Sequence, residues 1–233
     1  MLSVRGLAAR YGRALALDAV SFEVGAGESW ALLGRNGAGK STLLKALIGL
    51  VRPSAGTVRF AGRVVAGEPP YRIARLGMGY VPEERRVFSG LTVAENLEVG
   101  RRPPAPGLPP WTPERLYALF PALSDLRHRP AGRISGGEQQ MLAIARTLMG
   151  NPRLLLLDEP SEGLAPVVLE SLAASLATLR TQGLTLLLAE QDLRFAGRLA
   201  ERAMVVERGG LSWTGPLAAL REDGATLARY LGA

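Results

Sequence analysis

The sequence lacks several residue types on which whole classes of function depend. None of its 233 residues is cysteine, which excludes a disulfide framework and thiolate metal sites and fits a reducing compartment. Lysine occurs only at Lys40 and Lys45, so the net charge of +7 comes almost entirely from arginine. Aromatic residues make up 6%, and no basic run is interleaved with them as a nucleic-acid groove requires. We therefore expect no nucleic-acid partner, and assign the charge to a solvated surface or to an anionic ligand such as nucleotide or lipid headgroups.

Long hydrophobic runs are also missing. No apolar stretch reaches the ~18 residues that span a bilayer, and the longest, such as Leu154–Leu157 and Leu184–Ala189, are followed by acidic residues. Runs of this length are typical of buried strands in a parallel sheet. If the protein works at a membrane, we expect another chain to supply the membrane-spanning part.

The pattern that is present is that of one α/β domain. Apolar residues make up 47% and charged residues 21%, and the length suits one large domain with a small appended subdomain. Strands alternate with helices in the last third, which favours βαβ units and a mostly parallel sheet. The proline-rich segment 103–110 is expected to join two helices, the second capped by Thr112. The expected strands are 2–4, 19–24, 29–33, 57–60, 153–158, 184–189 and 203–207, and the expected helices are 42–48, 112–120, 166–181, 193–201 and 227–231.

The strongest local pattern is a glycine-rich loop between an apolar strand and a helix. Residues 34–42 fit the phosphate-loop pattern of Gly, four residues and Gly-Lys-Ser/Thr. Glycines let successive backbone N–H groups face a phosphate, and the helix N-terminus adds partial positive charge. Lys40 is predicted to reach the β- and γ-phosphates, and the Ser41 hydroxyl to ligate Mg²⁺. The alternative is a glycine-rich turn without a ligand. The predicted nucleotide-binding residues of the loop are Gly34, Asn36, Gly37, Gly39, Lys40, Ser41 and Thr42.

A second pattern is a buried strand that ends in two acids. Leu154–Leu157 is followed directly by Asp158 and Glu159. Ligands of open α/β sheets bind at the carboxyl ends of the strands. Beside a phosphate loop, this pattern predicts that Asp158 holds Mg²⁺ and that Glu159 polarises the attacking water.

A third pattern is the segment Ile-Ser-Gly-Gly-Glu-Gln-Gln at residues 134–140. Ser135 is expected to cap the helix that follows, while Gly136 and Gly137 let backbone amides approach a phosphate. Without the other two patterns, this segment would be interpreted as an ordinary helix cap with two flexible glycines.

Together these patterns resemble the ABC ATPases over the whole length of the chain. The segment 134–140 is similar to their Leu-Ser-Gly-Gly-Gln signature, and it precedes the acidic strand as in that family. More narrowly, the chain resembles the smaller of the two ATPases of branched-chain amino acid uptake systems. The residues behind the narrower match are 81–88 (VPEERRVF), 91–97 (LTVAENL), 135–145, 158–166, 189–191 (AEQ) and 230–232 (YLG).

The resemblance implies an α/β fold with a phosphate-loop NTPase (RecA-like) core. It further implies a mostly parallel sheet, an N-terminal antiparallel β part and a small α-helical subdomain. Residues 1–233 would form a single ABC ATPase domain. Within it, roughly residues 1–78 and 152–233 would form the catalytic core with the antiparallel part, and roughly 79–151 the helical subdomain with the signature.

The resemblance also implies a head-to-tail dimer that sandwiches two ATP molecules. Each nucleotide would contact the phosphate loop of one copy and the residues Ser135–Gly137 of the other. Tyr11 occupies the position whose ring stacks on adenine; the alternative places that ring in the core. Ser161–Pro166 matches the loop that crosses to the other copy, but Ala165 replaces its usual aspartate. An alanine side chain cannot make the polar contact of an aspartate.

Two positions depart from the common ABC pattern and agree with the branched-chain type. Glu83 stands where a glutamine senses Mg²⁺ and the γ-phosphate; a carboxylate can approach Mg²⁺ but cannot donate a hydrogen bond. Gln191 replaces the switch histidine, and its amide can donate to the γ-phosphate but cannot shuttle a proton. Mechanisms that need a histidine here are excluded. Glu159 becomes the expected general base, with Lys40 and Gln191 as the other catalytic residues.

The implied function is ATP hydrolysis that drives import of branched-chain or other hydrophobic amino acids, at the cytoplasmic face of the cell membrane. The implied partners are membrane permeases docked at Glu83–Leu97, a second ATPase subunit that is a paralogue or a second copy, and, indirectly, a substrate-binding protein. That segment is alternatively a loop with a solvated charged face. Alternative functions are urea or short-amide import, lipid or lipopolysaccharide export, or a non-transport ABC ATPase. Non-transport ABC ATPases usually carry long insertions or a second ATPase domain, and 233 residues leave no room for either. A module that binds nucleotide without turnover is disfavoured by Glu159.

Overall fold

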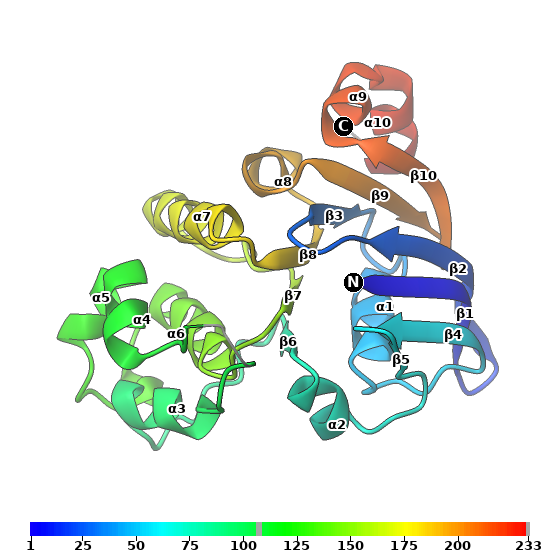
Figure 1. Cartoon of the computed structure of the whole chain (residues 1–233). Coiled ribbons are helices and arrows are strands. Elements are labelled where there is room, and N and C mark those ends of the chain that lie inside the picture. The colour runs from blue at the N-terminus through cyan, green and yellow to red at the C-terminus, as the bar shows by residue number, and fades with distance from the viewer. Residues whose placement is uncertain (106–108, 232–233) are drawn as a thin grey trace.

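The computed structural model of the chain describes residues 1–105 and 109–231. Two β-sheets lie side by side, with helices packed against them and a group of helices to one side (Figure 1). Part of the proline-rich segment, residues 106–108, and the Gly232 of the C-terminal match lie outside the described residues.

The first sheet has four strands, β1 (Leu2–Tyr11), β2 (Ala14–Val24), β4 (Ala55–Phe60) and β5 (Arg63–Val64). Their order is β2-β1-β4-β5, and all neighbouring pairs are antiparallel. The sequence pattern made β1 and β2 too short. Both strands pair as far as Tyr11 opposite Ala14, but register shifts along β1 interrupt the apolar alternation that reveals a strand.

The second sheet has six strands in the order β10-β9-β3-β8-β7-β6. They are β3 (Ser29–Leu33), β6 (Met78–Val81), β7 (Leu154–Asp158), β8 (Thr185–Glu190), β9 (Arg202–Glu207) and β10 (Gly210–Pro216). All neighbours are parallel except the β9–β10 pair. Strands β3, β7 and β8 are buried along their whole length, which explains their continuous apolar runs. The expected mostly parallel α/β sheet is confirmed.

The helices are α1 (Lys40–Leu47), α2 (Pro70–Arg75), α3 (Val93–Gly100), α4 (Pro113–Leu119), α5 (Pro121–Asp125), α6 (Gly136–Leu148), α7 (Pro166–Thr181), α8 (Leu193–Leu199), α9 (Leu217–Glu222) and α10 (Gly224–Leu231). Thr112 caps α4 as expected, its Oγ1 accepting from the Arg115 amide at 3.4 Å. Helix α1 begins two residues earlier than expected, because the phosphate loop runs into its first turn without a break. Helix α8 ends two residues earlier and α10 begins three residues earlier than expected.

The core has two parts, separated by the six-stranded sheet. Leu155 and Leu157 of β7 face one part, which includes residues of α6, α7 and α8. Leu154 and Leu156 face the other, which includes α1 and the four-stranded sheet. Because β3, β7 and β8 run in parallel, the loops that follow them meet at one edge of the sheet. No helix among the described residues is long and apolar enough to cross a membrane.

Candidate functional site

The phosphate loop connects the end of β3 to the start of α1. Gly34 and Gly39 have positive φ angles of 150° and 115°. A Cβ at Gly34 would lie 2.4 Å from the Val206 carbonyl oxygen, and one at Gly39 would lie 3.0 Å from that of Ala16. Both positions therefore require glycine. The N-cap residue of α1 is Gly39, which has no side chain to cap the helix, so the first N–H groups of α1 are available to an anion.

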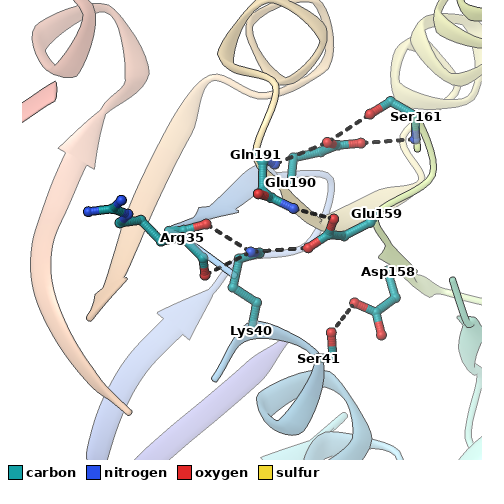
Figure 2. A network of polar contacts seen from close by, with 9 residues as sticks. Arg35, Lys40, Ser41, Asp158, Glu159, Ser161, Glu190 and Gln191 are labelled. Carbon is teal, nitrogen blue, oxygen red and sulfur yellow. Dashed lines mark hydrogen bonds and ion pairs between the residues drawn. The ribbon is translucent and has the colours of Figure 1, made fainter. Parts of the chain in front are cut away.

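Lys40 holds its ammonium group at the centre of this loop (Figure 2). Its side chain is 3% exposed, and Nζ donates to the carbonyls of Gly34 at 2.8 Å and Arg35 at 3.3 Å. Nζ also forms an ion pair with Glu159 Oε1 at 3.1 Å. A buried ammonium so placed is a strong binding group for a phosphate.

Asp158 ends β7 and accepts hydrogen bonds from two hydroxyls. Ser41 Oγ donates to Oδ1 and Tyr80 OH donates to Oδ2, both at 2.9 Å. Burial raises the pKa of the Asp158 carboxyl, and the two hydrogen bonds oppose that shift. Burial and the charge of Asp158 also raise the pKa of Tyr80, which keeps its hydroxyl a donor. Sequence reasoning missed Tyr80. It lies near the end of β6 and reaches Asp158 because β6 pairs with β7, and this pairing cannot be read from the sequence.

Ser41 and Asp158 together fit a Mg²⁺ ion that arrives with a nucleotide. Their oxygens are hard ligands that Mg²⁺ prefers, and this ion commonly takes one or two protein ligands besides phosphates and water. Across residues 1–105 and 109–231, no group of three or more His, Cys, Asp or Glu could form an all-protein metal site. Glu83, the third predicted ligand, is exposed at the rim of the same cavity. Partial burial and the nearby Glu162 and Glu159 raise its pKa.

Glu159 and Gln191 lie in direct contact. Gln191 Nε2 donates to Glu159 Oε2 at 2.6 Å, so the carboxylate is held between this amide and the Lys40 ammonium. The Glu159 side chain is 9% exposed, which leaves it reachable from the cavity. The lone histidine, His128, is exposed in the segment between α5 and the 3₁₀ turn Ala131–Arg133, and it contacts Arg127. No histidine is available to act beside Glu159.

A cavity of about 670 Å³ opens over the phosphate loop. Tyr11 lines it and is 54% exposed, which rules out the alternative that its ring lies in the core. Arg208, in the turn between β9 and β10, lines it as well and was missed by sequence reasoning. The other lining residues are Leu15, Ala16, Asn36, Gly37, Ala38, Gly39, Lys40, Ser41, Thr42, Glu83, Glu159, Glu162 and Gly209.

The predicted signature residues, by contrast, do not line this cavity. Ser135 caps α6 in a reciprocal box: its Oγ accepts from the Glu138 amide at 3.3 Å, and Glu138 Oε2 accepts from the Ser135 amide at 2.6 Å. A Cβ at Gly136 would lie 2.3 Å from Arg85 Nη1, and one at Gly137 would meet Val168 at 2.6 Å. Within one chain, the structure therefore does not bring this segment to the phosphate loop.

The loop after Glu159 is anchored by Glu190, to which the sequence analysis assigned no role of its own. Glu190, the last residue of β8, accepts hydrogen bonds from the Ser161 amide at 3.1 Å and hydroxyl at 2.9 Å. Ala165, which replaces the usual aspartate of this loop, is exposed before α7 and offers no polar side chain. An acid directly after a buried apolar strand was the available signal for Glu190.

Comparison with known proteins adds four similarities. The profile of the ABC transporter family matches residues 17–162. The chain is 44% identical over 232 residues to the high-affinity branched-chain amino acid transport ATP-binding protein BraG of Pseudomonas aeruginosa, covering 100% of both proteins. It is 32% identical over 234 residues to the lipopolysaccharide export system ATP-binding protein LptB of Acidithiobacillus ferridurans, covering 100% of this chain and 97% of that protein. It also resembles the dimeric post-hydrolysis structure of an ATP-binding cassette bound to ADP and Pi, with a TM-score of 0.78, 25% identity and coverage of 93% and 99%.

Proposed function

This chain belongs to the ABC transporter family and is an ATPase, and we propose that it powers the import of branched-chain amino acids through partner permeases. The observation behind this substrate class is the 44% identity over the full length to a branched-chain amino acid transport ATP-binding protein. The identity to a lipopolysaccharide export ATPase is lower, at 32%. Glu83 and Gln191, which the resemblance described above associates with the branched-chain type, support the same substrate class.

The proposed chemistry is attack of water on the γ-phosphate of ATP, which breaks the bond between the γ-phosphorus and the oxygen bridging to the β-phosphate and releases ADP and phosphate. Lys40 binds the β- and γ-phosphates, exchanging part of its contact with Glu159 for the nucleotide. Ser41 and Asp158 would hold Mg²⁺, with Glu83 at the rim; when bound, the ion neutralises charge on the phosphates. Glu159 accepts the proton of the water, and Gln191 orients Glu159 and donates to the γ-phosphate. Tyr11 stacks on the adenine at the open end of the cavity.

The proposed active form is a head-to-tail pair with a second copy or a paralogue. Ser135, Gly136 and Gly137 lie outside the cavity of their own chain, so a partner's signature is free to complete the site from across an interface. The structural similarity to a dimeric cassette supports this arrangement. The chain would then act at the inner face of the cell membrane, in indirect contact with a substrate-binding protein.

The proposed permease contact is the segment Glu83–Leu97, on the helical subdomain that we propose for about residues 79–151. The buried Asn96 holds the segment: its Nδ2 donates to the carbonyl of Phe88 at 3.0 Å, and its Oδ1 accepts from the Phe88 amide at 2.9 Å. Arg146 Nη2 donates to the Arg86 carbonyl at 2.7 Å. A segment held at several points supports a shaped contact surface over a freely solvated loop.

The experiment that tests this function is purification of the tagged protein from its native, detergent-solubilised membranes, with companions identified by mass spectrometry. We expect multi-span permeases, a second ATPase and an amino-acid-binding protein. Recovery of a lipopolysaccharide or amide transport system would replace the substrate class. Companions restricted to ribosomal or DNA-processing proteins would refute the transport role.

A further inference from the structure

Glu190 is a buried carboxylate that none of the roles above uses. It is 1% exposed, and no ion pair forms with it among the described residues. Its oxygens instead accept from the Ser161 amide at 3.1 Å, the Ser161 hydroxyl at 2.9 Å and the Gln191 amide at 3.2 Å. A carboxylate buried without a cation depends on such donors. Glu190 and its donors therefore hold one another in place.

The donors belong to two loops that leave neighbouring strands. Ser161 follows Glu159 by two residues after β7, and Gln191 begins the loop after β8. The Glu159 amide donates to the Ala189 carbonyl at 2.9 Å, which joins the two loops at their start. Gln191 Nε2 then reaches Glu159 Oε2 at 2.6 Å and closes a ring of contacts through Ser161 and Glu190 (Figure 2).

Glu159 needs support of this kind because its backbone conformation is unfavourable. Its φ angle is 44°, in the left-handed region that residues other than glycine avoid. Such conformations persist only where the surrounding contacts impose them. Glu190 binds both the backbone and the hydroxyl of Ser161, and so restricts the turn in which Glu159 lies.

We propose that Glu190 is a positioning residue for ATP hydrolysis: by binding Ser161 and the Gln191 amide, it keeps the Gln191 side chain and the Glu159 carboxylate at hydrogen-bonding distance. The inference rests on the roles proposed above for Glu159 and Gln191. Both carboxyl oxygens of Glu190 are engaged by Ser161 and the Gln191 amide, so Glu190 acts through these neighbours. Misplacement of a catalytic group by about 1 Å can lower turnover about a hundredfold. Loss of Glu190 therefore affects kcat and leaves ATP affinity in place.

The first variant is Glu190→Gln, which preserves the side-chain volume. Its amide nitrogen must face a group that also donates, so at least one contact of the ring is lost. The assay uses the full chain together with the proteins that copurify with it. We expect kcat for ATP to fall at least about tenfold, while KM and the Kd for ATP stay within about threefold of the wild-type values. Glu201→Gln makes the same change at a side chain that is 72% exposed, and is expected to keep the wild-type rate.

Ser161→Ala removes one contact of the ring from its other side. We expect a smaller loss of kcat, and a double variant with Glu190→Gln that loses less than the two single losses multiplied together, because both changes act on the contacts of the same carboxyl group. If Glu190 had only a structural role, Glu190→Gln would lower the melting temperature without lowering kcat at an unchanged KM.

The proposal is overturned by a wild-type kcat in Glu190→Gln, by a loss confined to ATP binding, or by independent effects of the two substitutions. Glu159→Gln separates this inference from the proposed function. If Glu159→Gln abolishes hydrolysis while Glu190→Gln keeps the wild-type kcat, Glu190 is no positioning residue and the role of Glu159 stands. If Glu159→Gln hydrolyses ATP at the wild-type rate, both are wrong.

Discussion

Three carboxylates at the ends of two neighbouring strands occupy different surroundings, and each setting suits a different task. Asp158 accepts from two hydroxyls in a buried place, a setting that fits a metal ligand. Glu159 lies between a cation and an amide at the wall of the cavity, within reach of a water. Glu190 is enclosed by donors and meets no cation among the described residues, a setting that fits the organisation of loops.

The surroundings of Glu190 predict a pH dependence of stability. Burial raises its pKa from 4.5 to about 7. The folded state therefore holds a proton that the unfolded state has lost, and stability falls as the pH rises from about 5 to about 7. Glu190→Gln cannot ionise and escapes this loss. Its free energy of unfolding, relative to wild type, should rise by up to on the order of 3 kcal/mol across that range. Urea unfolding at a series of pH values measures it; a constant difference would contradict the prediction.

Tyr11 is predicted to bind the base without supporting the fold. Tyr11→Ala should weaken ATP binding by about 1–3 kcal/mol, the usual contribution of an aromatic ring stacked on a base. Tyr11→Phe keeps the ring and should bind like wild type. Because Tyr11 is 54% exposed, neither change should alter the free energy of unfolding much. Calorimetric titration with ATP checks this, and equal affinities in both variants would exclude the adenine contact.

At the scale of elements, the two ends of the site depend on how helices begin. Helix α1 begins at the phosphate loop after Gly39, which has no side chain to cap it, while α6 begins with a complete capping box at Ser135 and Glu138. The unmet N–H groups of α1 are those that a phosphate would bind. At α6 the side chains of Ser135 and Glu138 satisfy backbone N–H groups of the first turn. Ser135 itself is exposed, so another chain can reach it.

Ser135→Ala is predicted to affect both stability and turnover. Loss of the cap should lower the free energy of unfolding by about 1 kcal/mol. Thr112→Ala, at the cap of α4, is the matched control and should cost a similar amount. Only Ser135→Ala should lower ATP turnover, by about tenfold or more, because only this segment is proposed to contact the partner's nucleotide. ATP hydrolysis and urea unfolding of both variants test this, and equal turnover would count against the shared site.

At the scale of the whole molecule, a second cavity of about 440 Å³ lies between the core and the helices α3 and α6. Four of its lining residues are large, apolar and about half exposed: Leu50, Tyr71, Phe88 and Val99. The guanidinium of Arg146 lies 4.8 Å from the centre of the Phe88 ring, which helps to hold this ring at the surface. Exposed apolar groups gathered in a hollow are typical of a binding surface for another protein.

Phe88→Ala is therefore predicted to weaken the permease contact without harming the nucleotide site. Recovery of permease subunits in a purification through the tagged chain should fall several-fold, while ATP affinity stays at the wild-type value. Val64→Ala is the matched control, since Val64 is 50% exposed and Phe88 is 49% exposed, but Val64 lies on β5 away from this cavity. Equal recovery with both variants would place the permease elsewhere.

The sequence by itself determined the parts of the site whose chemistry lies in consecutive residues. The phosphate loop, the Asp158–Glu159 pair and the capped glycines after Ser135 are each read from one short segment, because local backbone geometry imposes their residue types. Buried strands such as β3 and β7 were also readable within one residue, since their apolar runs are continuous. Strand β1 was cut short because register shifts break the period-two signal.

Only the tertiary structure decided which of these segments meet. The contact of Gln191 with Glu159 spans 32 positions, that of Glu190 with Ser161 spans 29, and that of Tyr80 with Asp158 spans 78. These pairs arise because parallel strands end at the same edge of the sheet, and the strand order is a property of the whole core. The same packing keeps Ser135 out of its own chain's cavity. The spacing of residues along the chain does not show which loops meet, because the distances between loops depend on the order in which the strands beneath them pack.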